Sequence, residues 1–163
     1  MANKNDFSVD DWDVIRNAPN LVAATMMVAG KSGMLGTFGE AFAVARSMYD
    51  SLSSDTPLIR DIANPEETKE AQEHINHLLT GFDSDRRADE LKAATLAKLD
   101  QALVLISEKD SSDLAAYKQW VYSIAERVAR ASKEGAFLGF GGEVVSAQEE
   151  ALLQELRTKL NVG

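Results

Sequence analysis

Apolar residues recur at alternating steps of three and four along most of the chain. The clearest set, between residues 111 and 134, consists of Leu114, Tyr117, Val121, Ile124, Val128 and Ala131. A second set with the same steps consists of Leu35, Phe38, Phe42, Ala45, Tyr49 and Leu52. This spacing places the side chains on one face of an α-helix, and no segment shows the period-two alternation of a strand. The pattern predicts an all-α fold.

Helix-capping residues, prolines and glycines divide the chain into helices, and we expect about six of them to form a bundle. Ser8 caps the first helix together with Asp11, and Ser146 caps the last helix together with Glu149. Pro19 lacks the amide hydrogen that a helix interior needs. We therefore expect one helix to end near Asn17 and a second to run from about Pro19 to Gly30. Further helices are expected at about 33–52, 65–80, 83–109, 111–134 and 146–160, with one or two turns after Pro57.

The helix expected at 19–30 has no polar face, and a helix that is apolar all round is a buried one. We place it at the centre of a bundle. The chain has 163 residues, of which 45% are hydrophobic, so residues 1–163 fit a single helical domain with a sizeable core.

The charge and the cysteine content limit the classes of partner that the protein can bind and the cell compartment in which we expect it. The net charge is −9, which is the wrong sign for a protein that binds nucleic-acid phosphates or anionic membranes. The chain contains no cysteine, and its first residues show no basic segment followed by an apolar one, as a secretory signal would. We expect a cytoplasmic protein without nucleic-acid or membrane partners.

The C-terminal part of the chain carries a distinctive glycine-rich segment. Residues 131–142 read ASKEGAFLGFGG and are followed by Val145, Ser146 and Glu149. Together with Asp11-Trp12, Ala18-Pro19 and the Ser32-Gly33-x-x-Gly36 turn, this segment resembles a family of small bacterial all-helical proteins. The resemblance covers both ends of the chain but not residues 53–110, and Gly30-Lys31 departs from the Asp-Pro type of helix break expected there. It implies a compact bacterial domain and brings no activity, cofactor or catalytic residue.

The only two histidines lie near one glutamate on the helix expected at 65–80. Glu70, His74 and His77 stand at positions i, i+4 and i+7, which share one helix face. Imidazole and carboxylate groups suit zinc, iron or manganese. However, Glu-x-x-x-His differs from the Glu-x-x-His spacing of di-iron bundles, and no second such motif occurs. These residues are therefore a candidate metal site or a plain polar helix flank, and we expect no cofactor.

The glycine-rich segment itself is the candidate binding site. Phe137, Gly139, Phe140, Gly141 and Gly142 could form an apolar rim or an anion-binding nest beside the last helix. The segment matches neither the dinucleotide-binding nor the P-loop glycine pattern. The alternative is a tight interhelical connection in which the glycines supply positive φ angles and the phenylalanines close the end of the bundle.

Residues 17–45 contain only two charges, Lys31 and Glu40. The apolar helix there has about a dozen apolar residues, against roughly 20 for a membrane span. We interpret the segment as a hairpin buried by other helices or half-buried in a homodimer. Because no nucleophile with a base is recognisable, the sequence predicts a non-enzymatic domain that acts through protein–protein contact or self-association.

Overall fold

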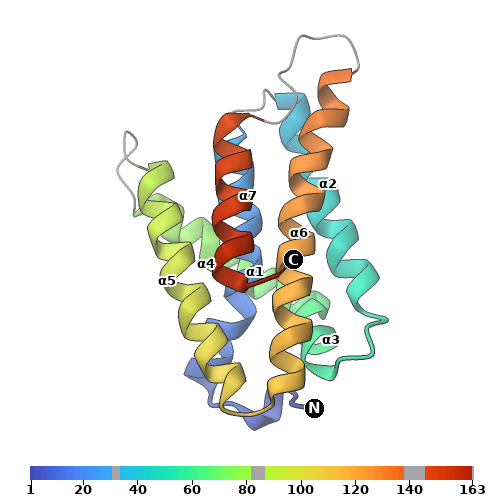
Figure 1. Cartoon of the computed structure of the whole chain (residues 1–163), viewed down its shortest axis with the longest axis vertical. Helices are drawn as coiled ribbons and strands as arrows, with labels where there is room; N and C mark the ends of the chain where they lie inside the picture. Colours follow the sequence, from blue (N-terminus) through green and yellow to red (C-terminus); the bar gives the residue numbers. More distant parts are fainter. Residues whose placement is uncertain (31–33, 82–86, 138–145, 163) are drawn as a thin grey trace.

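The computed structural model describes residues 1–30, 34–81, 87–137 and 146–162, and it shows an all-α bundle (Figure 1). In these residues a short 3-10 turn, η1 (Lys4–Asp6), is followed by α1 (Val9–Ala29), α2 (Met34–Ser51), α3 (Pro57–Ala63), α4 (Pro65–Thr80), α5 (Arg87–Ser107), α6 (Ser111–Phe137) and α7 (Ala147–Leu160). The described ranges contain no strand, so the predicted fold class is confirmed.

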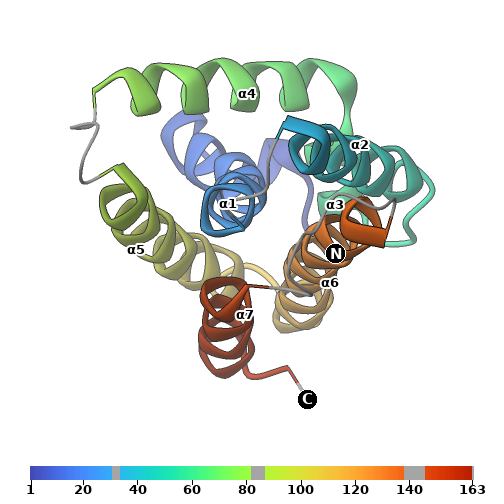
Figure 2. The same cartoon turned by 90° about the horizontal axis from the view of Figure 1, so that it is seen from above.

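Helix α1 lies at the centre of the bundle. Seen from above, α2, α4, α5, α6 and α7 surround it, and α4 crosses the others at one side (Figure 2). Ile15, Leu21 and Met26 of α1 are almost completely buried. The predicted central helix is therefore confirmed, and its apolar character follows from its position among the other helices. None of the described helices is long and apolar enough to cross a bilayer.

The predicted break at Pro19 is wrong. Residues 9–29 form one continuous helix, with Pro19 in its interior. A proline at this position cannot donate to the carbonyl of Ile15, four residues earlier. The hydroxyl of Tyr117 on α6 replaces the missing donor, with 2.9 Å between Oη and the Ile15 oxygen. A side chain that lies 102 positions away along the chain therefore allows the helix to continue past Pro19.

Both predicted helix caps are confirmed. Ser8 Oγ accepts a hydrogen bond of 3.1 Å from the Asp11 amide at the start of α1. At the start of α7, Ser146 Oγ accepts from the Glu149 amide, and Glu149 Oε2 accepts from the Ser146 amide at 2.8 Å. These bonds satisfy amide groups that have no partner within the helix, which fixes where each helix begins.

Two groups of buried side chains hold the helices together. The larger group joins α1, α2, α3, α5, α6 and α7, and it contains Tyr117, Val121, Ile124 and Val128 from the predicted apolar face of α6. The smaller group consists of Leu21, Ile75 and Leu91, and it attaches α4 to α1 and α5. Helix α4 thus rests on the bundle through few apolar contacts.

Candidate functional site

The glycine-rich segment lies mostly outside the described residues. Phe137 is the last residue of α6, and its side chain is not among those described. Gly139, Phe140, Gly141 and Gly142 fall in the gap between residues 137 and 146. The binding site predicted there therefore stays a prediction.

The histidine motif is placed on α4, as its spacing requires. His74 is half-buried and His77 is exposed, whereas the Glu70 carboxylate forms an ion pair with the guanidinium of Arg16 on α1. Among the described residues, no group of three or more histidine, aspartate or glutamate side chains is arranged to hold a metal ion. The structure does not bring the three candidate ligands together as a metal site.

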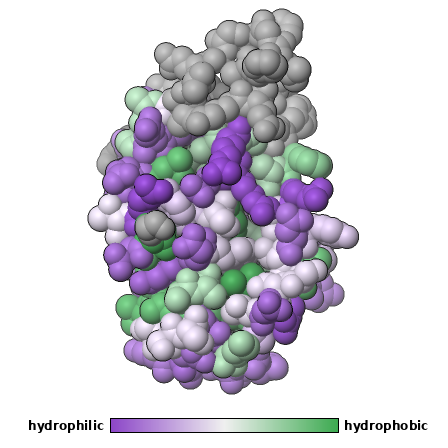
Figure 3. All heavy atoms as spheres, turned by 45° about the vertical axis from the view of Figure 1, so that its right-hand side comes forward, coloured by the Kyte–Doolittle hydropathy of each residue, from purple (hydrophilic) through white to green (hydrophobic). Residues whose placement is uncertain are grey.

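Helix α2 turns the described part of its apolar stripe outward. Phe42 and Tyr49, two members of the stripe with three-four spacing, are 70% and 72% exposed, and Leu52 just beyond the helix is 38% exposed. The buried side of α2 instead carries Ser47, Met48 and Ser51. Figure 3 turns the α2 side of the molecule forward and shows green apolar patches among purple polar side chains. An amphipathic helix normally buries such a stripe, so this face lacks its usual cover.

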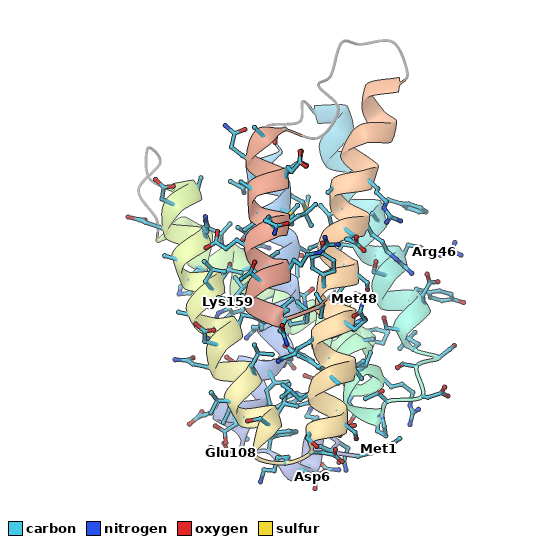
Figure 4. The ribbon with its side chains drawn as sticks, viewed as in Figure 1. Met1, Asp6, Arg46, Met48, Glu108 and Lys159 are labelled. Atoms are coloured by element: carbon cyan, nitrogen blue, oxygen red, sulfur yellow. The ribbon has the colours of Figure 1, made fainter. Side chains whose placement is uncertain are left out.

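Polar contacts keep the serine side of α2 against α6. Trp120 Nε1 donates to Ser51 Oγ at 2.7 Å, and Arg127 Nη1 donates to Asp50 Oδ2 at 2.9 Å. The hydrogen bond from Arg127 holds the pKa of the Asp50 carboxyl below its ordinary value. Figure 4 shows Arg46 extending away from the outer side of α2, and Met48 on the side toward the bundle. These contacts fix the rotation of α2 about its axis and therefore the outward direction of the stripe.

A groove of about 750 Å³ opens beside the outward face of α2. We call it the α2 groove. Its lining consists of Asn20, Ala23, Ala24, Met27 and Val28 from α1, Ala41, Val44, Ala45, Met48 and Tyr49 from α2, Leu52, Ala63, and Pro65, Thr68, Gln72 and Ile75 from α4. The alanines on α1 and α2 leave the groove wide, because their methyl groups do not reach across the space between the two helices. The groove falls in the range of roughly 300–1,000 Å³ that is typical of binding pockets.

The lining of the α2 groove, as far as the chain is described, contains no charged side chain. Its polar groups are the amides of Asn20 and Gln72 and the hydroxyls of Tyr49 and Thr68. The Asn20 side chain is almost fully buried and donates to the Arg16 carbonyl at 3.2 Å, which fixes its position in the groove. Without an acid, a base or a cation, this arrangement suits the binding of a neutral apolar group and offers no group for proton transfer at neutral pH.

A buried ion-pair network holds α4, one wall of the groove, in place. Glu67 of α4 accepts hydrogen bonds from Lys4 Nζ, from Trp12 Nε1 at 2.8 Å and from Arg16 Nη1 at 2.9 Å. Arg16 also pairs with Asp13 at 2.8 Å. Burial lowers the pKa of Arg16, but its carboxylate partners raise it more, so its pKa lies above the ordinary value. The network compensates for the few apolar contacts of α4.

Sequence reasoning did not identify the groove, although one signal pointed to it. The stretch 17–45, which is poor in charge, supplies eight of the lining residues, from Asn20 through Ala45. The low charge of this stretch predicts a hairpin that is buried by other helices or half-buried in a homodimer. The part that α4 contributes, including Thr68 and Gln72, gives no sequence signal, because isolated polar residues on a helix are ordinary.

The chain matches no protein-family model, no curated protein and no solved structure.

Proposed function

We propose that this chain is a non-enzymatic interaction domain that receives the apolar face of a helix from a protein chain in the α2 groove. The outward apolar stripe of α2 carries the proposal. Exposed apolar patches of this kind mark contact surfaces on proteins. Val28, Tyr49 and Leu52 are large exposed apolar residues of the groove lining, and Phe42 is exposed on α2, the helix that also carries Tyr49. The absence of cysteine suits the bacterial cytoplasm as its compartment.

The chemistry of the groove defines the segment that it would accept. The lining offers methyl, thioether and ring surfaces with few neutral polar groups, and a buried charge without a partner would be costly there. A helix that presents leucine, methionine or alanine at positions i, i+3, i+4 and i+7 fits these requirements. A strongly basic segment does not, even though the chain as a whole has a charge of −9.

A designed peptide tests the proposal. The peptide is a fluorescent amphipathic helix of zero net charge with a leucine and alanine face, and fluorescence anisotropy measures its binding. Ala45→Trp places an indole ring in the groove and should weaken binding by about tenfold or more. Ala97→Trp, at an exposed alanine on α5, is the matched control and should leave binding unchanged.

A scrambled peptide is the control for the apolar helix face, and three results would contradict the proposal. A peptide with the same composition and a scrambled sequence has no continuous apolar face and should not bind. Equal binding of both peptides, equal binding by the Ala45→Trp and Ala97→Trp variants, or no binding at peptide concentrations up to about 1 mM would each refute the proposed function.

A further inference from the structure

Asn20 is an unusual residue for its position in the central helix. Between residues 18 and 29, α1 contains only two polar side chains, those of Asn20 and Thr25. The Thr25 hydroxyl is paired inside the protein, with the Leu21 carbonyl oxygen at 2.8 Å and with the Thr95 hydroxyl at 2.7 Å. Asn20 is 8% exposed and lines the α2 groove, so its amide is the polar group that α1 presents there.

The Asn20 side-chain oxygen has no hydrogen-bond partner among the described residues. Asn20 Nδ2 donates to the Arg16 carbonyl oxygen at 3.2 Å. A carbonyl oxygen only accepts, so the amide nitrogen must make this contact, and Oδ1 is the end of the amide that stays free. Oδ1 accepts nothing in the described part of the chain, and water can reach it through the groove. Most polar atoms in such buried side chains have a partner, so this oxygen requires an explanation.

Two polar side chains of α4 that line the groove also keep free acceptor atoms. Thr68 Oγ1 donates to the Pro65 carbonyl oxygen at 3.0 Å. Gln72 Nε2 donates to Asn76 Oδ1 at 3.3 Å. Each donor is therefore engaged within α4, while the oxygen of each side chain accepts nothing from the described residues. The polar atoms that α1 and α4 leave unused in the groove are mainly acceptors, which favours an occupant that brings a donor.

A docked helix changes the surroundings of the Asn20 oxygen. In the open groove, water can pair with this oxygen. The helix displaces that water, and a face made only of leucine and alanine leaves the oxygen buried without a donor. A side-chain amide in the docked face supplies an N–H donor, and its own oxygen can accept the second hydrogen of Asn20 Nδ2. A lysine would also donate, but its charge would be costly in a lining that is uncharged over the described residues.

The α1 wall of the groove also limits where this donor can lie. Asn20 is the first α1 residue of the lining, and Met27 and Val28 follow about two helical turns later. The wall is therefore polar at one end and apolar at the other. A single polar residue in an otherwise apolar helix contact sets the register of the two helices, as a buried asparagine does in coiled coils.

We infer that Asn20 selects the helix that the α2 groove receives: the docked apolar face carries one asparagine or glutamine, whose side-chain amide pairs with Asn20 Oδ1. The inference rests on the proposed function and names a chemical feature of the partner. Asn20 is then the specificity-determining residue of the groove, while the apolar lining supplies most of the affinity.

A set of matched peptides tests this inference. The parent is the designed amphipathic peptide with its leucine and alanine face, and each further peptide replaces one leucine of that face by asparagine, which has a similar size. Fluorescence anisotropy gives the dissociation constant of each peptide for the wild type and for Asn20→Leu. We expect one asparagine position at which the dissociation constant, divided by that of the parent peptide, is at least about tenfold lower for the wild type than for Asn20→Leu.

Control variants separate the Asn20 contact from other effects. Gln101→Leu removes an exposed side-chain amide on α5, outside the groove, and should keep the wild-type ratios. Each ratio compares the same two peptides on both proteins, so differences in the helicity of the free peptides cancel. Asn20→Ala removes the same amide without adding bulk, and it replaces Asn20→Leu if that variant loses the helical circular-dichroism spectrum of the wild type.

The outcomes distinguish the inference from the proposed function. If the parent peptide binds and Ala45→Trp weakens its binding, but no asparagine position changes its ratio between the wild type and Asn20→Leu, the inference is wrong and the proposed function survives. If Gln101→Leu changes the ratios as much as Asn20→Leu does, the inference is also wrong. If no peptide of the set binds at concentrations up to about 1 mM, both fail.

Discussion

The Tyr117 hydroxyl on α6 donates a hydrogen bond of 2.9 Å to the carbonyl oxygen of Ile15 on α1. This acceptor lacks a donor within its own helix because the residue four positions later is Pro19. Tyr117 is completely buried, and burial raises the pKa of its hydroxyl far above the ordinary value, so the group remains a donor at every physiological pH. The proline in the central helix and the tyrosine on its neighbour therefore act as a pair.

This pairing predicts that removal of the Tyr117 hydroxyl lowers the free energy of unfolding by different amounts in the presence and in the absence of Pro19. Tyr117→Phe should lower the free energy of unfolding by about 1–3 kcal/mol, because the Ile15 carbonyl is left buried without a donor. In a Pro19→Ala background the new amide can donate to Ile15, so the same substitution should cost less. Urea unfolding of the four proteins measures the difference. Equal costs in the two backgrounds would show that the proline does not create the need for the tyrosine.

A second buried pair joins α1 to α5. The Thr25 and Thr95 hydroxyl oxygens lie 2.7 Å apart, and Thr25 Oγ1 is 2.8 Å from the Leu21 carbonyl oxygen. Each single Thr→Val substitution should destabilise the protein by about 1–2 kcal/mol, because it leaves the other hydroxyl with one partner fewer. The double substitution should destabilise the protein by less than the sum of the two single effects. Thermal unfolding of all four proteins gives this coupling, and strict additivity would contradict it.

The Glu67 network predicts a pH dependence of stability. Burial raises the pKa of Glu67, but hydrogen bonds from Lys4, Trp12 and Arg16 lower it more, so its pKa in the folded state lies below the ordinary value of 4.5. A carboxyl group whose pKa is lower in the folded state stabilises the protein above its unfolded pKa. This stabilisation is lost as the pH falls through the folded pKa.

Glu67→Gln tests this pH dependence. The substitution should lower the free energy of unfolding at pH 7 by on the order of 3 kcal/mol, since it leaves Arg16 and Lys4 without their shared buried partner. It should also reduce the loss of stability between about pH 5 and pH 3. Glu73→Gln, at an exposed residue of the same helix, is the control and should leave the pH profile unchanged. An identical profile for wild type and Glu67→Gln would refute the prediction.

Replacement of Asn17 by an apolar residue should stabilise the protein. Its side chain is completely buried in α1, and neither its amide nitrogen nor its oxygen has a hydrogen-bond partner within the described part of the chain. Asn17→Leu, which keeps a similar size, should raise the free energy of unfolding by about 1–2 kcal/mol, because no buried polar group is then left unpaired. Asn20→Leu removes a buried asparagine that does form a hydrogen bond, so a melting temperature that rises equally in both variants would contradict the explanation.

Local signals in the sequence were enough to locate most helices. Ser8 and Ser146 marked two helix starts correctly, because a cap depends only on residues within one turn. The seam on α6 was likewise confirmed, since the partners on both sides of a central seam are apolar. Pro19 misled the prediction, because the Tyr117 hydroxyl that satisfies the Ile15 carbonyl comes from a distant part of the chain.

The sequence by itself determined the class of this protein: three-four spacing and helix caps specify packed helices, because these effects act between residues that are near neighbours along the chain. Only the tertiary structure decided which way α2 faces. Its stripe looks like a buried surface, but the hydrogen bonds of Ser51 and Asp50 with α6 rotate it outward. The α2 groove exists because α1, α2 and α4 pack with alanines where they face one another. These segments are distant from one another in the sequence, so no local sequence pattern predicts the groove.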